Sequence, residues 1–511
     1  MIAKPLSAPF WAGIAAFGVY SAELNNFLRF EQYPLLRMEV FYAVAIGALV
    51  AALFGLFYGA AENAGMLAGR IIRALLVAAL VGYAVALLAD GPYAKVAAGT
   101  ALLISWFAGE KILRPLAIMS YAALLAASLG IGQQTQSQFV LTGVQAKGPM
   151  TKPPIVHIIL DQHIGVEGFP KNDPDAPKVK QLLKSYYTAH GFRLFGGAYS
   201  QYVKTWRSIP SILNFGGANE SKASAYFKAL KAGGYRINVI QSGWIDYCSA
   251  LVDRCTTYHQ QSFAPVVTAP LSAGQKAVLI VTKMIPKSVS EAVFKSYVRI
   301  ERAGYDVSAP VPSRNLSPVA LNGLAALRRL QEDLTHVQPG QVYFAHILLP
   351  HQPFELRPDC SVAPIGQWLE AAPGYPIAAR QKNYDQQVIC NVRAISGIVE
   401  AIDRSAAGRN SIIIVHGDHG SRIGDVEPMA ENMGKTGDDA LVAGFSTLFA
   451  VRAPGIRSGY DSLHYPVEDL VEELAESNWT KTGSYPVARP SVNIIDQRFV
   501  EASRRNLPTW W

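Results

Sequence analysis

The sequence predicts a chain in two parts: an α-helical membrane domain of about five transmembrane helices, followed by an α/β doubly wound domain. Three observations predict this. Apolar stretches fill the first 135 residues, short β-branched runs then alternate with helical patterns, and all four cysteines lie in that later part. At 511 residues the chain is also too long for one ordinary domain. The predicted boundaries are 1–135 for the membrane domain, 136–154 for a linker and 155–511 for the second domain.

The membrane prediction depends on hydrophobic length. Half of the residues are hydrophobic and only 16% are charged, compared with roughly 25% charged in a typical soluble protein. The apolar stretches approach the roughly 17–25 residues that a membrane-spanning helix needs. They are residues 8–24, 38–61, 71–89, 94–109 and 113–132. Because four further stretches follow the first, an uncleaved span is predicted there and not a signal peptide.

The loop charges predict the orientation. With five spans, one side of the membrane receives basic residues, and the other side receives loops of mixed or low charge. Cytoplasmic loops carry an excess of Lys and Arg, so the basic side is predicted to be cytoplasmic. The basic residues are Lys4, Arg70, Arg73, Lys111 and Arg114. An odd number of spans then places everything after about residue 135 outside the cytoplasm.

The cysteines fit a compartment that permits disulfides. Cys248, Cys255, Cys360 and Cys390 are the four candidates. Four cysteines allow three pairings, and spacing does not select among them. Cys248–Cys255 with Cys360–Cys390 is the simplest choice. The alternative is four buried free thiols.

The second domain is predicted from alternation of strand and helix patterns. Short β-branched runs, typical of buried strands, occupy 155–160, 236–241, 342–349, 411–416 and 446–452. Helical patterns at 221–234, 318–337 and 386–405 lie between them. Such alternation over some 350 residues favours one doubly wound sheet with helices on both faces.

The net charge of +8 suits an anionic membrane surface or an anionic substrate. The chain has no Lys/Arg run dense enough to indicate nucleic acid. We therefore expect a membrane partner and no nucleic-acid partner.

Polar side chains follow the predicted strands. Asp161 comes directly after 155–160, Asp418 and His419 follow 411–416, and His346 and His351 lie at the end of 342–349. Ligands of an α/β sheet bind beyond the carboxyl ends of its strands, so these groups are expected to meet along one edge.

Thr205 opens a predicted helix, where free N–H groups and the helix dipole favour an anion such as phosphate. A threonine hydroxyl becomes a nucleophile when a base or metal takes its proton. Asp161, Asp418 and His419, with Thr205 Oγ1, would form a four-coordinate site for one divalent metal, zinc or manganese. Each of these residues alone could equally be a turn residue or a helix cap. The four together indicate a metal site.

The set resembles the alkaline phosphatase/sulfatase superfamily, and within it the membrane-anchored branch that includes lipoteichoic acid synthases and lipid A phosphoethanolamine transferases. The transferase motif T-x-x-S-[small apolar]-P is similar to T-W-R-S-I-P here, which implies that Thr205 is the nucleophile. D-H-G matches Asp418, His419 and Gly420, and H-x₄-H-x-P matches His346 and His351. In layout the resemblance covers essentially the whole chain; in detail it covers these short motifs.

The sequence departs from the family pattern in three places. The first metal ligand of those transferases is a glutamate, where this chain has Asp161, as phosphatases and sulfatases do. Ser421 follows D-H-G, where glutamate is frequent. The C-x-P-x-R or S-x-P-x-R sequence of true sulfatases is missing from TWRSI, which disfavours sulfate-ester hydrolysis.

The resemblance implies a transferase of the bacterial inner (plasma) membrane, multi-pass, with its catalytic domain in the periplasm or outside. It would move a phosphoethanolamine or phosphoglycerol type of head group from an anionic or zwitterionic phospholipid donor, through phospho-Thr205, to a glycan or lipid acceptor. His351 would act in catalysis and, with His346, bind substrate. Apart from the resemblance, Trp244 and Arg357 are candidates to line the substrate pocket, and a structural role for each is an equal alternative. The alternatives are a phosphoric or sulfuric ester hydrolase with the same site, and a non-catalytic membrane scaffold or sensor.

Overall fold

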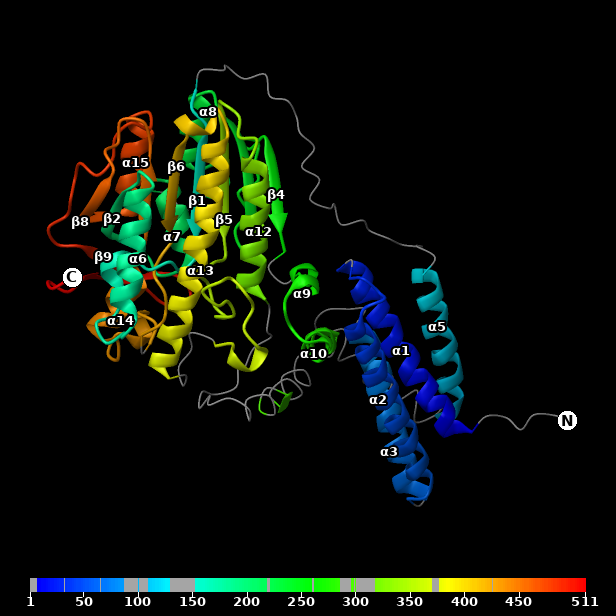
Figure 1. The fold of residues 1–511 in the computed structure, drawn as a ribbon. Helices are drawn as coiled ribbons and strands as arrows, with labels where there is room; N and C mark the ends of the chain where they lie inside the picture. The colour runs from blue at the N-terminus through cyan, green and yellow to red at the C-terminus, as the bar shows by residue number, and fades with distance from the viewer. Residues whose placement is uncertain are drawn as a thin grey trace. The chain divides into compact units, whose positions relative to one another are not determined.

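The computed structural model describes residues 7–31, 33–64, 66–86, 100, 109–128, 152–217, 221–259, 262–284, 296–297, 299, 318–369, 376–424 and 426–511 (Figure 1). Contacts divide the chain into two compact units. The first comprises Met1–Val140, Val266–Ile300 and Ser313–Asn315, and the second comprises Leu141–Pro265, Glu301–Pro312 and Leu316–Trp511. Each unit is described by itself below.

The first unit is helical. Its long helices are α1 (Ala8–Phe30), α2 (Met38–Glu62), α3 (Met66–Ala86) and α5 (Leu113–Ser128), joined by the shorter α10 (Ala273–Met284). Helix α1 packs on both α2 and α5, and α2 also contacts α3 and α10. Small residues allow α1 and α2 to approach closely: a Cβ atom on Gly55 would lie 2.8 Å from the carbonyl oxygen of Pro9.

The prediction of five membrane spans is supported for one of them. Among the described residues, Met38–Ala61 is the one helix long and apolar enough to cross a membrane, with a mean hydropathy of 2.4. Polar residues reduce the hydropathy of α1, which carries Glu23 and Arg29, and α3 carries Arg70 and Arg73. Only 16 residues form α5. The fourth predicted stretch, 94–109, lies almost wholly outside the described residues.

The second unit is built on an eight-stranded sheet with the strand order β4-β3-β5-β1-β6-β7-β2-β8. Its strands are β1 (Ile155–Leu160), β2 (Arg193–Tyr199), β3 (Arg236–Ser242), β4 (Arg254–Tyr258), β5 (Gln341–Ile347), β6 (Ile412–Gly417), β7 (Phe449–Arg452) and β8 (Gly459–Pro466). A separate antiparallel pair contains β9 (Ser491–Ile495) and β10 (Glu501–Asn506).

The mixed α/β sheet matches the predicted fold class, with one difference in strand direction. Strand β1 pairs in parallel with β5 on one side and β6 on the other. Strand β7, however, is antiparallel to both β6 and β2. All six residues of β1 are buried, as expected for a central parallel strand with helices on both faces.

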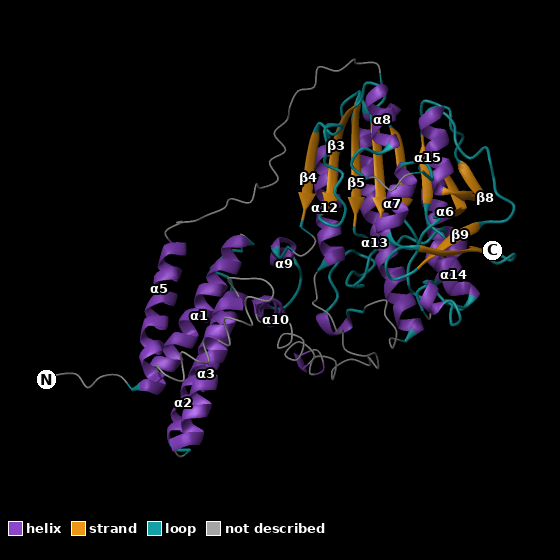
Figure 2. Ribbon diagram, turned by 180° about the vertical axis from the view of Figure 1, so that it is seen from behind, coloured by secondary structure: helices purple, strands orange, loops and turns teal. Residues whose placement is uncertain are grey.

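Helices cover both faces of this sheet (Figures 1 and 2). One layer contains α6 (Ala176–Ala189), α12 (Val319–Leu334) and α13 (Ile377–Arg404); the other contains α7 (Thr205–Leu213), α8 (Ala225–Ala232) and α15 (Val467–Glu476). Helix α14 (Asp438–Phe445) lies between β6 and β7 in the sequence, and α9 (Ala264–Thr268) crosses the boundary between the two units. Side chains of β1, β5 and β6 pack against those of α7, α8 and α15 in one hydrophobic core, which includes Ile155, Phe344, Ile414, Phe227 and Leu470. This packing holds α7 against the central strands.

Both predicted disulfides form in the second unit. Cys248 pairs with Cys255, and Cys360 pairs with Cys390. The second bond joins the turn after Leu356 to the middle of α13.

Candidate metal and phosphoryl-transfer site

The two aspartates of the candidate site follow neighbouring strands. In the register of β1 and β6, Leu160 is opposite Gly417, so Asp161 and Asp418 are the next residues of each chain segment. Both side chains are completely buried. A parallel sheet brings the carboxyl ends of its strands to one edge, which is why residues 257 positions apart meet here.

His419 is the third candidate ligand beside the two aspartates. The glycine that follows it, Gly420, constrains the backbone at this point. A Cβ atom on Gly420 would collide with the carbonyl oxygen of Ala443, so only glycine allows this approach to the end of α14. The N–H of Gly420 donates to the carbonyl oxygen of Gly444 at 2.9 Å. The glycine of D-H-G therefore fixes the position of the two residues before it.

Hydrogen bonds also orient the Asp418 and His419 side chains. Asp418 Oδ1 accepts the N–H groups of Gln162 at 3.0 Å and of His419 at 2.8 Å. His419 Nδ1 donates to the carbonyl oxygen of Gly420 at 2.6 Å. Since that bond takes the proton of a neutral imidazole, Nε2 keeps its lone pair and can bind a metal.

Thr205 is the first residue of α7 and is almost fully buried. Its hydroxyl donates to Asp161 Oδ2 at 3.3 Å and lies 3.3 Å from His419 Nε2. The first turn of a helix has free N–H groups and a partial positive charge. The hydroxyl therefore lies where its own ionised form, and an anion beside it, are stabilised.

The donor set fits a divalent cation. Asp161, Asp418 and His419 each offer one ligand atom within 4.8 Å of the others. Asp161 Oδ1 and Asp418 Oδ2 are buried and have no hydrogen-bond partner among the described residues. Buried carboxylates without partners are costly unless a cation neutralises them. Two carboxylate oxygens, one imidazole nitrogen and one hydroxyl suit zinc or manganese.

The electrostatics of the aspartates agree with this requirement. Burial and then the charge of Asp161 raise the pKa of Asp418. Burial alone would also raise the pKa of Asp161, but the neighbouring His351, His346 and His419 lower it below its ordinary value. The site thus holds one carboxylate firmly ionised beside a second that repels it, and a bound cation relieves that repulsion.

His346 and His351 lie at the same edge of the sheet. His346 Nε2 is 3.6 Å from Asp161 Oδ2, and in the described part of the chain neither ring nitrogen of His346 has a hydrogen-bond partner. His351 Nδ1 donates to the carbonyl oxygen of Gln352, which leaves Nε2 to face other groups. Trp244 packs edge-on against the His351 ring with centroids 4.7 Å apart. His346 and His351 therefore both lie near Asp161, and Trp244 contacts His351.

Arg357 does not join them. It is exposed in a turn closed by the hydrogen bond from Cys360 N to its own carbonyl oxygen, and its charge acts on Asp359 in the same turn. Arg357 is close to the H-x₄-H motif in sequence, but this does not bring its side chain to the site. The structure gives no support for a substrate contact by Arg357.

Two other histidines, within the central strands, are structural. His157 and His416 are buried in β1 and β6, with their Nε2 atoms 2.8 Å apart. His416 Nδ1 donates to the carbonyl oxygen of Gly417, so His157 Nε2 must be the donor between the two rings. The hydroxyl of Tyr226 then donates to His157 Nδ1 at 2.6 Å. These bonds tie the two strands together below the aspartates.

Three charged residues that precede or follow the motifs of the site were not among the predicted site residues. Lys204 Nζ lies 2.6 Å from Glu427 Oε1, and Arg422 Nε lies 2.8 Å from the same oxygen. Lys204 directly precedes Thr205, and Arg422 comes three residues after His419. Their positions beside the two motifs could have marked Lys204 and Arg422 as candidate site residues.

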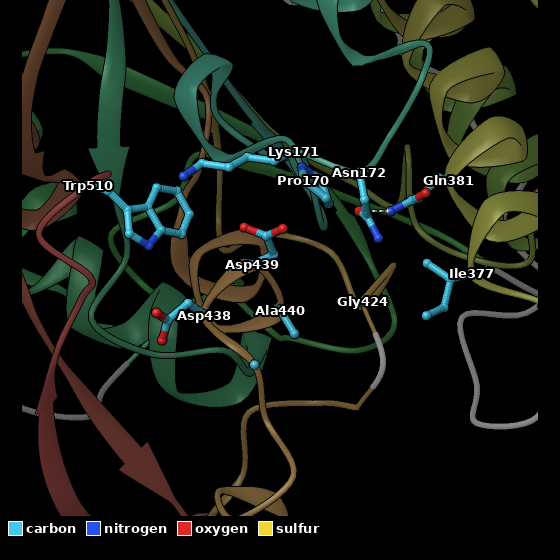
Figure 3. Close-up of a pocket in the computed structure, with 11 residues that line it drawn as sticks. Pro170, Lys171, Asn172, Ile377, Gln381, Gly424, Asp438, Asp439, Ala440 and Trp510 are labelled. Atoms are coloured by element: carbon cyan, nitrogen blue, oxygen red, sulfur yellow. Dashed lines mark hydrogen bonds between the residues drawn. The ribbon is translucent and has the colours of Figure 1, made fainter.

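A separate cavity of about 390 Å³ lies in the same unit (Figure 3). The Lys171 ammonium lies over the Trp510 ring, 3.4 Å from its centroid, and Gln381 donates to Asn172 across the opposite side. The carboxylates of Asp438 and Asp439, from the first turn of α14, complete the polar lining. The cavity does not include the metal-ligand candidates, and it has no part in the function proposed below.

No protein-family model matches this chain, and no curated protein matches it in sequence. Solved structures with a similar fold do exist. The C-terminal periplasmic domain of EcEptC from Escherichia coli is 13% identical, with a TM-score of 0.40, over 70% of this chain and 92% of that domain. The same domain has also been solved in complex with Zn.

Two further similar structures are a 2-O GAG sulfatase and the phosphonate monoester hydrolase of Agrobacterium radiobacter. Each is 12% identical with a TM-score of 0.41; they cover 68% and 67% of this chain, and 79% and 80% of their own chains. At these identities and TM-scores the similarity concerns the fold alone. The function proposed below depends on the side chains of this chain.

Proposed function

We propose that this protein is a membrane-bound, metal-dependent transferase that moves a phospholipid-derived phosphoryl head group through a phospho-Thr205 intermediate to a glycan or lipid acceptor. One observation carries the proposal. The Thr205 hydroxyl lies 3.3 Å from both Asp161 Oδ2 and His419 Nε2, at the start of a helix and within a buried metal-ligand set. That is the environment in which a threonine hydroxyl becomes nucleophilic.

Asp161, Asp418 and His419 would hold the metal, with Thr205 Oγ1 as the fourth ligand. When bound, a zinc or manganese ion lowers the pKa of a coordinated hydroxyl and offsets charge on phosphoryl oxygens. Asp161 Oδ2 accepts the Thr205 hydrogen bond and so orients the oxygen lone pair. The N-terminus of α7 stabilises the negative charge that develops during attack.

The transfer has two balanced steps. The Thr205 oxygen forms a bond to phosphorus as the bond from phosphorus to the lipid alcohol breaks, and the alcohol leaves with a proton. An acceptor hydroxyl then attacks phospho-Thr205, loses its proton and restores the Thr205 hydroxyl. We assign the exchange of both protons to His351, because its Nδ1 donates to the carbonyl oxygen of Gln352 and its Nε2 is left to accept and return a proton.

The first unit supports a lipid donor. Helix α2 exposes Leu49, Leu56 and Phe57, and α3 exposes Leu67 and Leu75. Large exposed apolar surfaces of this kind are typical of contact with lipid. We infer from them, and from the basic loops, a multi-pass protein of the bacterial inner membrane with residues 155–511 outside the cytoplasm. Protease added to spheroplasts is expected to cleave within residues 155–511 and to leave residues 1–135 in the membrane.

The experiment that tests the function follows both products. Metal-loaded protein is incubated with vesicles of phosphatidylethanolamine and phosphatidylglycerol and a lipid-linked glycan fraction. Wild-type protein is expected to release diacylglycerol in step with a modified acceptor, and Thr205→Ala to release none. Diacylglycerol with free phosphorylated head group instead would indicate the hydrolase. No product from wild type, together with no bound metal, would indicate the scaffold.

A further inference from the structure

Two basic side chains meet on one carboxylate beside the nucleophile. Lys204 Nζ and Arg422 Nε lie 2.6 and 2.8 Å from Glu427 Oε1. The three side chains are partly buried, with exposures of 17%, 23% and 20%. The metal-site motifs do not include any of them, and the transfer chemistry described above does not use them.

Backbone hydrogen bonds anchor both residues close in sequence to Thr205 and His419. Lys204 caps α7, and its carbonyl oxygen accepts the N–H of Ser208 at 2.8 Å, so its side chain starts one residue before Thr205. The carbonyl oxygen of Arg422 accepts a hydrogen bond from Arg380 Nη1 at 3.3 Å. Arg422 is close enough to His351 for its charge to lower the pKa of that imidazole, after the larger effect of burial.

The charges of this cluster do not balance among its three members. One carboxylate faces two cations, because Lys204 Nζ and Arg422 Nε both lie within 2.8 Å of Glu427 Oε1. A lysine and an arginine held side by side offer several N–H donors and two positive charges, which suit a multiply charged oxyanion better than a single carboxylate. Glu427 Oε1 has the position that an oxygen of such an anion would take between them.

We propose that Lys204 and Arg422 form an anion-binding subsite for phosphoryl oxygens of the substrate, and that Glu427 is the counter-ion that keeps the two cations in place when the subsite is empty. The proposal rests on the phosphoryl-transfer function proposed above and adds residues to it. The phosphoryl oxygens could belong to the lipid donor or to a phosphate group on the acceptor. The chemistry of recognition is the same for both.

Inorganic phosphate is the probe that tests this subsite. Binding to the full-length, zinc-loaded protein in detergent is measured by titration calorimetry at low ionic strength. Arg422→Met and Lys204→Met are each expected to weaken phosphate binding about tenfold, as expected for losing one charge-assisted hydrogen bond. Glu427→Gln is expected to tighten binding, because it removes the competing carboxylate but keeps the shape of the side chain.

Arg498→Met is the matched control, because this arginine is 83% exposed and pairs with Asp496 in the turn before β10. Its phosphate affinity should equal that of wild type. Zinc content and melting temperature are measured for every variant, so that a misfolded protein is recognised. Unchanged affinity in both Arg422→Met and Lys204→Met overturns the subsite. Weaker binding by a folded, zinc-loaded Glu427→Gln overturns the counter-ion role.

The half-reactions then separate the two sources of phosphate. With phosphatidylethanolamine and phosphatidylglycerol vesicles alone, slower formation of phospho-Thr205 in Arg422→Met assigns the subsite to the donor. Formation at the wild-type rate, followed by slower loss when acceptor is added, assigns it to the acceptor. If wild type forms no adduct at all, the proposed function fails, while the phosphate titration still decides the subsite independently.

Discussion

Asp161 and Asp418 stand at the same level of two adjacent parallel strands, each one residue beyond the register pair Leu160 and Gly417. Both carboxylates are fully buried, and each has one oxygen without a hydrogen-bond partner in the part of the chain that the structure describes. Their mutual repulsion and their free oxygens are the physical reason to expect a cation between them.

The first prediction concerns Asp418→Asn. In the metal-loaded protein this change removes a charged ligand, so metal content should fall below one ion per chain and the melting temperature should drop. In chelator-treated protein the same change removes the repulsion from Asp161, so the melting temperature should rise relative to wild type. Mass spectrometry of bound metal and thermal unfolding with and without chelator measure both effects.

Asp246→Asn is the control for this pair of measurements. Asp246 is an exposed partner of Lys222, 2.7 Å away, and surface ion pairs contribute only about 0–1 kcal/mol. It should change neither metal content nor the response to chelator. An Asp418→Asn protein that keeps its metal, or loses stability equally in both conditions, would contradict a shared cation.

A second prediction concerns Gly420→Ala. The added methyl group would collide with the carbonyl oxygen of Ala443, so the segment carrying Asp418 and His419 must shift. Metal affinity is expected to fall by about 10–100-fold, the usual cost of disturbing residues that orient metal ligands. Competition with a zinc chelator measures it. Gly434→Ala, where a Cβ atom meets nothing within 4 Å, should leave the affinity unchanged; equal affinities for all three proteins would contradict the steric account.

The Cys360–Cys390 bond gives a third prediction. It closes a sequence separation of 30 residues, for which chain entropy suggests a stabilisation of about 3–4 kcal/mol. Replacing both cysteines with alanine should lower the melting temperature by several degrees and leave metal content unchanged. The Cys248–Cys255 bond spans 7 residues and should matter less. A larger loss from the shorter loop, measured by thermal unfolding, would contradict this ranking.

A fourth prediction follows from Asp385 in α13. Burial and then the charge of Asp173 raise its pKa to about 9. A carboxyl group with a folded pKa above its unfolded value, about 4, destabilises the fold increasingly as pH rises between those two values. Asp385→Asn should therefore stabilise the protein, and by more at pH 8 than at pH 5, because each pH unit between the two pKa values contributes up to about 1.4 kcal/mol. Thermal unfolding at both pH values measures the difference.

Glu476→Gln, at the exposed end of α15, removes a carboxylate without this burial and is the control. Its melting temperature should follow wild type at both pH values. An Asp385→Asn gain of equal size at pH 5 and pH 8 would mean that the buried charge is not the cause.

The sequence predicted the centre of the sheet well and its margins poorly. Strand β1 was predicted residue for residue, because a run of buried β-branched side chains bounded by Pro154 and Asp161 has few other structures. Strands β2, β4 and β8 of the sheet were missed: β2 contains two glycines, and β4 and β8 are only partly buried. The antiparallel direction of β7 was also missed, since a short apolar run has no directional signal.

The candidate site was predictable where short motifs mark it. Asp161, Thr205, Asp418 and His419 come together as expected, and Arg357 does not. Lys204 and Arg422 were missed because isolated basic residues are usually solvated, and only the fold shows that both reach Glu427. The five-span count exceeded what the described helices show, since polar residues in α1 and α3 reduce their hydropathy below that of α2.

The measurement that tests the central claim most directly is intact-protein mass spectrometry of the metal-loaded protein after incubation with phospholipid vesicles and no acceptor. We predict one added phosphoryl head group, mapped by peptide sequencing to Thr205, absent after chelation and absent in Thr205→Ala. Thr205→Ser should form the same adduct, because it keeps the hydroxyl. Lipid turnover by wild type with no adduct, and equal turnover by Thr205→Ala, would contradict the account.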